Sequence, residues 1–119
     1  MDLERLALAG SAISLAIGGY MLYGVVPLYL TVGTALEVAL LLLSLALFDR
    51  RPFRYLALVL NFLLLATLFD PAHVSAYERF GTDAWITALD VLSFLAFGVF
   101  PLTFLIVYFS KRKSNQRTL

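Results

Sequence analysis

The chain has 119 residues, of which 61% are hydrophobic and only 14% are charged, and its mean hydropathy is +0.89. Soluble domains contain roughly 45–50% apolar and about 25% charged residues, so this composition excludes an ordinary soluble domain and predicts an all-α, polytopic membrane protein. The net charge is +1 with no long basic tract for nucleic acid, and the absence of cysteine excludes disulfides and thiolate metal sites.

Residues 6–26 form the first predicted membrane span. The start of the chain, Met-Asp-Leu-Glu-Arg, is not net basic, so we interpret this segment as a retained span rather than a signal peptide. Residues 28–48 form the second span, and the two together would make a helix of about 64 Å, twice the roughly 30 Å of the hydrocarbon layer. The chain must therefore turn back at Gly24-Val25-Val26-Pro27, where glycine relaxes the backbone and proline suits the first turn of a helix.

Small residues recur at spacings of three and four along the first predicted span. They are Ala7, Gly10, Ser11, Ser14 and Gly18. Such a face lets membrane helices approach closely. We expect it to serve packing within one bundle, and a dimer seam is the alternative.

The third predicted span, residues 53–69, is short for a membrane helix and follows an arginine-rich connection. The polar segment after it begins with Asp70 and Pro71, which predict the start of a short interfacial helix over about residues 71–80. Gly81 is a suitable end for that helix.

Residues 84–110 form the fourth predicted span, and Thr82 or Asp83 is expected to cap its start. Gly98 and Pro101 should kink this helix. Residues 111–119 form a basic tail, which we expect to be disordered and cytoplasmic.

These elements predict one domain, residues 1–119, folded as a four-transmembrane-helix, up-down-up-down bundle. Four crossings bring both termini to one side of the bilayer, together with the arginine-rich connection. That side carries most of the fixed positive charge, whereas Arg79 is the only lysine or arginine on the other side. The positive-inside rule then predicts a multi-pass protein of the cell membrane with both termini in the cytoplasm.

Three polar side chains interrupt the predicted spans most deeply: Glu37, Asn61 and Asp90. At about 1.5 Å per residue, all three lie roughly 9–14 Å below the outer boundary, on different helices. Thr34 and Thr87 lie one turn nearer that boundary, on the same faces as Glu37 and Asp90. Because carboxylates in hydrocarbon normally face water or the interior of a bundle, we expect this polar cluster to converge on one interior site.

Apart from Arg54, next to the start of the third span, no lysine or arginine lies inside a predicted span, so charged carboxylates at Glu37 and Asp90 would lack a nearby cation. We predict that Glu37 is protonated at neutral pH or shares a proton with Asp90 through Asn61. Three interpretations of the cluster stay open: a hydrogen-bond clamp that holds the helices in register, a relay for a proton or a cation, and a site that receives a base from a partner subunit.

His73 is the only histidine, and Asp70 and Glu78 lie near it in the sequence, which raises the question of a metal site. Nothing in the sequence fixes the geometry of these residues, so we expect a solvated surface histidine and no metal. The sequence contains no nucleotide-binding, zinc, serine-triad or haem motif, so we predict no self-contained enzyme and no cofactor.

The run Glu37-Val38-Ala39-Leu40-Leu41-Leu42-Leu43-Ser44-Leu45, followed by Arg50 and Arg51 and then another span, resembles the second helix of the DoxX-like family. The resemblance covers about residues 30–66. It implies a small four-span bundle that is a subunit or helper of a membrane redox system. The chain departs from that family in its tight first turn and in lacking a Gly-Lys pair after the first span.

The leading prediction is a small, non-catalytic subunit or helper of a larger membrane complex, with other membrane subunits or further copies of the chain as partners. The alternative is a small oligomeric transporter coupled to protons or cations through Glu37 and Asp90. A quinone-linked redox protein is a third interpretation, which the resemblance alone implies.

Overall fold

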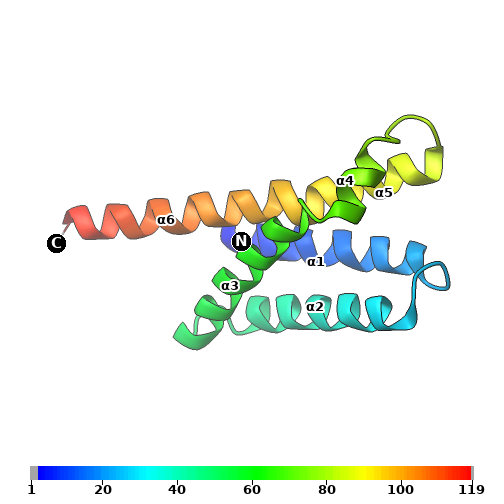
Figure 1. Ribbon diagram of the computed structural model, residues 1–119. Helices are drawn as coiled ribbons and strands as arrows, with labels where there is room; N and C mark the ends of the chain where they lie inside the picture. Colours follow the sequence, from blue (N-terminus) through cyan, green and yellow to red (C-terminus); the bar gives the residue numbers. More distant parts are fainter. Residues whose placement is uncertain (1–2, 119) are drawn as a thin grey trace.

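The computed structural model describes residues 3–118, although not the side chains of Ala72 and residues 112–118. The chain is all-α, and the described residues contain no strand. Its helical elements follow one another along the chain (Figure 1): α1 (Leu3–Leu22), α2 (Leu28–Ala46), α3 (Arg51–Thr67), α4 (Pro71–Tyr77), α5 (Ala84–Phe94), the π-helical segment η1 (Leu95–Val99) and α6 (Phe100–Thr118).

Three helices are long and apolar enough to cross a membrane: α1, α2 and the continuous helix Ala84–Lys111 that contains α5, η1 and most of α6. The third predicted span, residues 53–69, corresponds to α3, which is not among them. α3 has 17 residues. That is a length of about 26 Å, whereas the hydrocarbon layer is roughly 30 Å thick. Arg51, Arg54 and Asn61 also lower its hydropathy. The all-α prediction is confirmed, and the four-span bundle is not.

Glycine and proline shape the turn between α1 and α2. Gly24 has a φ of 81°, a left-handed conformation that residues with a Cβ adopt at a cost. Pro27 is the N-cap residue of α2, where its missing N–H breaks no helical hydrogen bond. The amides of Val25 and Val26 bond back to the carbonyl of Leu22 at 2.9 and 3.2 Å, which closes the turn.

The connection between α4 and α5 contains less helix than expected. α4 ends at Tyr77, before the predicted end. The Glu78 amide still bonds to the carbonyl four residues back, but the amides of Arg79 and Phe80 bond to carbonyls three residues back. Gly81 then takes a φ of 87°. Asp83 caps α5, since its Oδ1 accepts hydrogen bonds from the amides of Trp85 and Ile86 at 2.7 and 3.2 Å.

A π-helical segment, η1, lies where the sequence predicts a kink. Pro101 has no N–H, so the carbonyl one turn before it lacks its α-helical donor, and a locally wider helix accommodates this. Pro101 and Gly98 are both buried. A Cβ on Gly98 would lie 3.4 Å from the side chain of Leu68, so a small residue lets α3 end close against η1.

The long helix continues beyond its apolar part. α6 extends to Thr118, so the backbone of the tail that we expected to be disordered is helical instead. Lysine, arginine and glutamine are good helix formers, which favours this continuation. The side chains after Lys111 lie outside the described residues.

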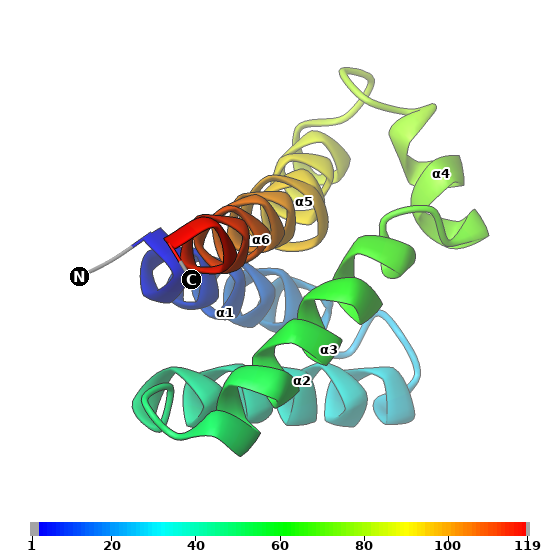
Figure 2. The same cartoon turned by 90° about the vertical axis from the view of Figure 1, so that its left-hand side faces the viewer.

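The elements form a bundle in which α3 is the exception. α1, α2 and the long helix of α5, η1 and α6 run side by side, and α3 crosses them obliquely (Figures 1 and 2). α1 packs against α2, α5, η1 and α6, whereas α3 packs against α2, η1 and α6. We call the end at the α1–α2 connection the turn end and the end at the α2–α3 connection the terminal end. α3 starts at the terminal end and stops well short of the turn end (Figure 1).

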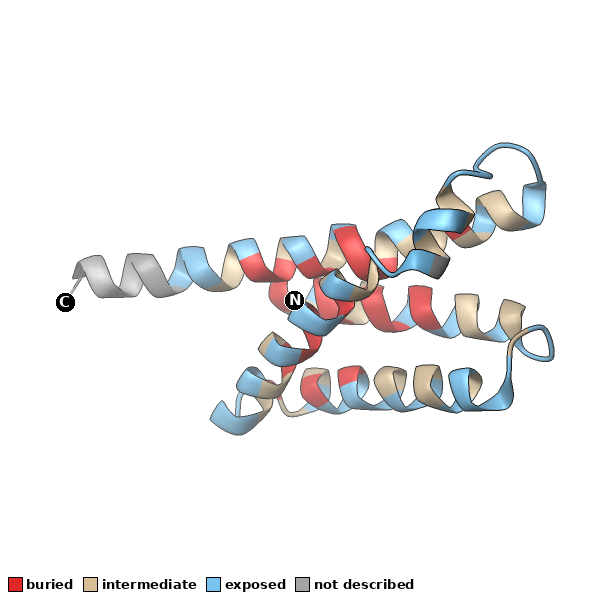
Figure 3. Cartoon of the chain, in the orientation of Figure 1, coloured by how far each residue is buried: buried red, intermediate tan, exposed pale blue. Residues whose placement is uncertain are grey.

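The core lies in the half of the bundle toward the terminal end, where α3 covers its neighbours (Figure 3). Leu8, Leu41, Ala57 and Phe104 are fully buried there. The rings of Phe48 and Phe104 meet edge to face, with their centroids 6.0 Å apart. Most side chains of α2 are exposed instead, and only 11% of its most apolar stretch is buried.

Ion pairs join three parts of the chain at the terminal end. Lys111 Nζ in α6 lies 2.8 Å from Oε1 of Glu4 in α1, and the Glu4 side chain is buried. Arg5 pairs with Asp49 in the α2–α3 connection, and its guanidinium carbon lies 5.6 Å from the centroid of the Phe48 ring. The start of α1, the α2–α3 connection and the later part of α6 therefore lie at the same end.

The small-residue face of α1 packs against the long helix of the same chain. The Ser11 hydroxyl donates a hydrogen bond to the carbonyl of Ala96 at 3.3 Å. Gly10 admits the ring of Phe100, since a Cβ there would lie 2.5 Å from Phe100 Cε1. Gly18 differs, because a Cβ on it would meet no other atom within 4 Å.

Candidate functional site

A cavity of about 550 Å³ lies between the helices in the half of the bundle that α3 does not cover. The second half of α1, the first half of α2, the short helix α4 and the α5–η1 segment form its walls. Thr67, the last residue of α3, contributes the one lining residue from that helix. The cavity therefore follows from the early end and oblique course of α3.

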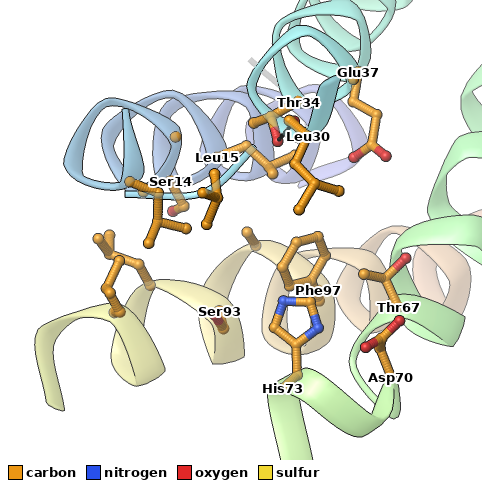
Figure 4. A pocket seen from close by; sticks show the side chains of 18 of the residues that line it. Ser14, Leu15, Leu30, Thr34, Glu37, Thr67, Asp70, His73, Ser93 and Phe97 are labelled. Carbon is orange, nitrogen blue, oxygen red and sulfur yellow. Dashed lines mark hydrogen bonds between the residues drawn. The ribbon is translucent and has the colours of Figure 1, made fainter. Parts of the chain in front are cut away.

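Carboxylates reach this cavity from different walls. Glu37 comes from the middle of α2, Asp90 from α5, and Asp70 from the residue just before α4. Figure 4 shows the Glu37 carboxylate pointing into the space between α2 and the opposite wall, where His73 and Phe97 lie. No lysine or arginine is among the described residues that line the cavity. The lining thus has an excess of acidic groups.

Asp90 is the most deeply buried of these acids. Its side chain is 1% exposed, and its Oδ2 has no hydrogen-bond partner among the described residues. His73 lies close enough to Asp90 for an electrostatic interaction. A buried carboxylate oxygen without a partner among the protein's own groups is costly, so this oxygen is available to a proton, a water molecule or a cation in the cavity.

His73 lies in the cavity wall, which corrects the expectation of a solvated surface histidine. It is half-buried, and its Nδ1 is buried without a hydrogen-bond partner in the described part of the chain. Its ring centroid lies 5.1 Å from that of Phe97 and 6.4 Å from that of Tyr77. The spacing of His73, Ala76 and Tyr77 on one face of α4 is the sequence signal that indicates an inward orientation.

Tyr77 extends the aromatic wall behind His73. Its ring stacks on Phe94 of α5 with centroids 4.5 Å apart. Burial raises the pKa of the Tyr77 phenol, and the nearby Asp90 carboxylate raises it further. The phenol oxygen is buried with no described hydrogen-bond partner. α4 is therefore held to α5 mainly by rings rather than by polar contacts.

Hydroxyl groups line the cavity, but some of them are already occupied. Thr34 donates to the carbonyl of Leu30 at 3.0 Å, and Thr67 donates to that of Leu63 at 2.8 Å. These are bonds within their own helices, one turn back. Such hydroxyls have no free hydrogen to donate to a ligand and present only their oxygen lone pairs.

The structure brings together part of the predicted polar cluster. Glu37, Asp90 and Thr34 line the same cavity, whereas Asn61 and Thr87 do not. The Asn61 amide nitrogen donates to the carbonyl of Ala57 at 2.7 Å, within the core that α3 makes. It does not bridge the two acids, because the oblique course of α3 carries it toward the terminal half. The Thr87 hydroxyl accepts a hydrogen bond from the Gly81 amide at 2.9 Å and holds the α4–α5 turn.

The grouping of possible metal ligands and the space beside the lining glycines both limit the kind of ligand that the cavity can hold. Among residues 3–111, whose side chains are described apart from Ala72, no group of three or more His, Asp and Glu could hold a metal ion. Glycines at 18, 19 and 33 line the cavity and leave room in it, since only Gly19 would bring a Cβ within 4 Å of another residue. The site is a roomy acidic cavity rather than a compact coordination shell.

No protein-family model matches this chain, and searches among curated proteins and solved structures find no match either.

Proposed function

We propose that this chain is a small multi-pass protein of the cell membrane in which α3 is a short, oblique fourth crossing. Both termini then lie in the cytoplasm, on the side of the arginine-rich α2–α3 connection. The three apolar helices and the shared terminal end of α1, α6 and that connection support this arrangement. The turn end then faces the outside, and the cavity lies in the outer half of the membrane.

We propose further that the cavity binds a cation in exchange for a proton, as in a small proton- or cation-coupled transporter. The observation that carries this proposal is the presence of Glu37 and Asp90 on one cavity with no basic side chain among its described lining residues. Two carboxylates in a space of low dielectric attract a positive charge, either a proton or a cation. Binding of a cation releases a proton from the carboxyl group, and loss of the cation returns the proton.

Proton movement in proteoliposomes tests the coupling. The purified chain is reconstituted with a pH-sensitive dye inside, and Na⁺, K⁺ or organic monovalent cations are added outside. We expect proton movement with the wild-type chain and at least about a tenfold lower rate with Glu37→Gln. Glu78→Gln is the matched control, because Glu78 is exposed on the α4–α5 connection and outside the cavity lining. A wild-type chain that moves no protons, or an unchanged rate with Glu37→Gln, would contradict the proposal.

A non-catalytic subunit or helper of a larger membrane complex is the second candidate function, and the exposed face of α2 favours it. Val32, Leu36, Leu40 and Leu43 are exposed at spacings of four, four and three along one side of that helix. Such a row matches the contact face of a partner helix as well as it matches lipid. The DoxX-like resemblance of this segment implies the same role.

Affinity purification from native membranes tests the second function. A subunit should bring stoichiometric partner proteins with it, and Leu36→Ala should weaken their recovery. Ile17→Ala is the control, since Ile17 is an exposed apolar residue on α1 rather than α2. Purification of the chain alone under mild detergent conditions would argue against a permanent complex.

A further inference from the structure

We propose that the ligand of the cavity is a hydrophobic organic monocation whose charge is spread over the molecule, rather than an inorganic ion. This inference rests on the proposed function, because it names the class of cation that the acidic cavity takes. Its evidence is the size of the cavity, the aromatic wall beside the buried acid, and the state of the hydroxyl groups.

The size of the cavity fits a molecule. A volume of about 550 Å³ lies within the range of roughly 300–1,000 Å³ that small-molecule sites occupy. A bare cation needs several oxygen ligands drawn close around it. The described acids and His73 form no such group. An inorganic ion would therefore leave most of this space empty.

The walls combine a counter-ion with aromatic faces. Asp90 is buried and has an oxygen without a hydrogen-bond partner among the described residues. The rings of His73 and Phe97, 5.1 Å apart, line the same cavity, and Tyr29 comes to it from α2. Figure 4 shows this ring pair across the space from Glu37. A cation over the face of an aromatic ring is attracted to it, most strongly where water is excluded.

The residues that line the cavity favour a ligand with a positive charge and an apolar surface. Thr34 and Thr67 use their hydroxyl hydrogens inside their own helices. Most of the other lining residues are apolar or glycine, among them Leu15, Leu30 and Gly18. A neutral sugar would leave the carboxylates of the lining without a counter-charge. A cation with dispersed charge and an apolar surface loses little, and the carboxylates neutralise it.

Binding of tetraphenylphosphonium to the purified full-length chain in detergent tests this inference. Isothermal titration calorimetry compares this cation with tetraphenylborate, which has the same shape and the opposite charge, and with neutral triphenylphosphine oxide. We expect saturable binding of the cation alone. Asp90→Asn should weaken it about tenfold or more, because a buried counter-ion is lost. Phe97→Leu should weaken it about fivefold through the lost ring face.

Matched controls separate a specific site from partition into detergent. Glu78→Gln and Phe62→Leu change exposed residues outside the cavity lining and should leave the affinity unchanged. Size-exclusion profiles identify any variant that fails to fold. If Asp90→Asn fails to fold, the affinity of Phe97→Leu alone decides the result. Equal binding of the three probes, or wild-type affinity in both cavity variants, would overturn the inference.

The two proposals fail in different ways. If Na⁺ or K⁺ drives proton movement through Glu37 and tetraphenylphosphonium does not bind, the coupled function stands and the organic ligand is wrong. If no cation drives proton movement and tetraphenylphosphonium still binds through Asp90, the cavity is an organic-cation site without coupling. If neither occurs, both proposals are wrong.

Discussion

Asp90 and His73 carry most of the functional information at the scale of single residues. Both are polar groups with a buried atom that has no hydrogen-bond partner in the described part of the chain. Folding alone gives no reason to keep such atoms, because each one costs free energy when it leaves water. A ligand or a proton that visits the cavity gives that reason.

Replacement of Asp90 should separate stability from binding. Asp90→Asn keeps the size of a side chain that is 1% exposed and removes its charge, so we expect the variant to be more stable than wild type by about 1–2 kcal/mol. The midpoint of thermal unfolding in detergent measures this. Asp83→Asn is the control, because asparagine caps a helix as well as aspartate does. The unfolding midpoint of this variant should equal that of wild type. A lower midpoint for Asp90→Asn would mean that the carboxylate stabilises the fold.

Tyr77 should make stability depend on pH in the alkaline range. Burial, followed by the Asp90 carboxylate, raises the pKa of its phenol above the ordinary value of 10.0. The folded chain therefore keeps this proton where the unfolded chain loses it. The contribution is constant below about pH 10, and stability falls as pH rises above it. Between about pH 9 and about pH 11, the midpoint of thermal unfolding should fall less for Tyr77→Phe than for the wild-type chain. The exposed Tyr23→Phe should behave as wild type does.

At the scale of elements, the local features of the chain were predictable. Gly24 and Pro27 mark the first turn, and Asp83 marks the start of α5, because each acts through its own backbone or the next few amides. The direction of α3 was not predictable, since the crossing angle depends on how side chains of several helices fit together. The position of Asn61 and the inward orientation of His73 follow from that angle. The sequence analysis therefore identified Glu37, Asp90 and Thr34 as a polar cluster, but it placed Asn61 in that cluster and left His73 out of it.

Two glycines of α1 should respond to substitution in opposite ways. Gly18→Leu places a side chain where a Cβ meets nothing within 4 Å, so it should fill the cavity, keep the unfolding midpoint and abolish ligand binding. Gly10→Ala places a Cβ 2.5 Å from Phe100 Cε1, so it should destabilise the fold by about 1–3 kcal/mol.

A second substitution checks the cause of the effect at Gly10. In a Phe100→Ala background the ring is absent, so Gly10→Ala should then cost little. An equal loss of stability in both backgrounds would show that the ring contact is not the cause. Unfolding midpoints of the single and double variants give this comparison.

At the scale of the whole molecule, the course of α3 decides how many times the chain crosses the membrane. The apolar segments of the sequence predicted four crossings, and the structure has three helices long and apolar enough to cross and a shorter one of 17 residues. A tilted helix of 17 residues spans less of the bilayer than an upright one, so a crossing by α3 requires a locally thinner bilayer.

Single cysteines determine the number of crossings, because the natural chain has none. Leu3→Cys, Glu78→Cys and Ser110→Cys place exposed thiols at the start of α1, on the α4–α5 connection and in α6. If α3 crosses, an impermeant maleimide applied to intact cells should label position 78 only. If α3 does not cross, positions 3 and 78 share one side and position 110 lies on the other. Permeabilised cells, in which all three react, are the control.

The π-helical segment η1 joins α5 to α6. Its winding determines the direction in which Asp90, on α5, points relative to α6. An α-helix turns about 100° per residue, so a change of one residue in the register of η1 would rotate α5 by about that angle relative to α6. Asp90 lies on α5, whereas the contacts of Phe104 and Lys111 lie on α6. Such a rotation would carry the carboxylate away from the ligand while the terminal half of the bundle stays fixed. The winding of η1 therefore fixes the direction of the Asp90 side chain relative to the terminal half of the bundle.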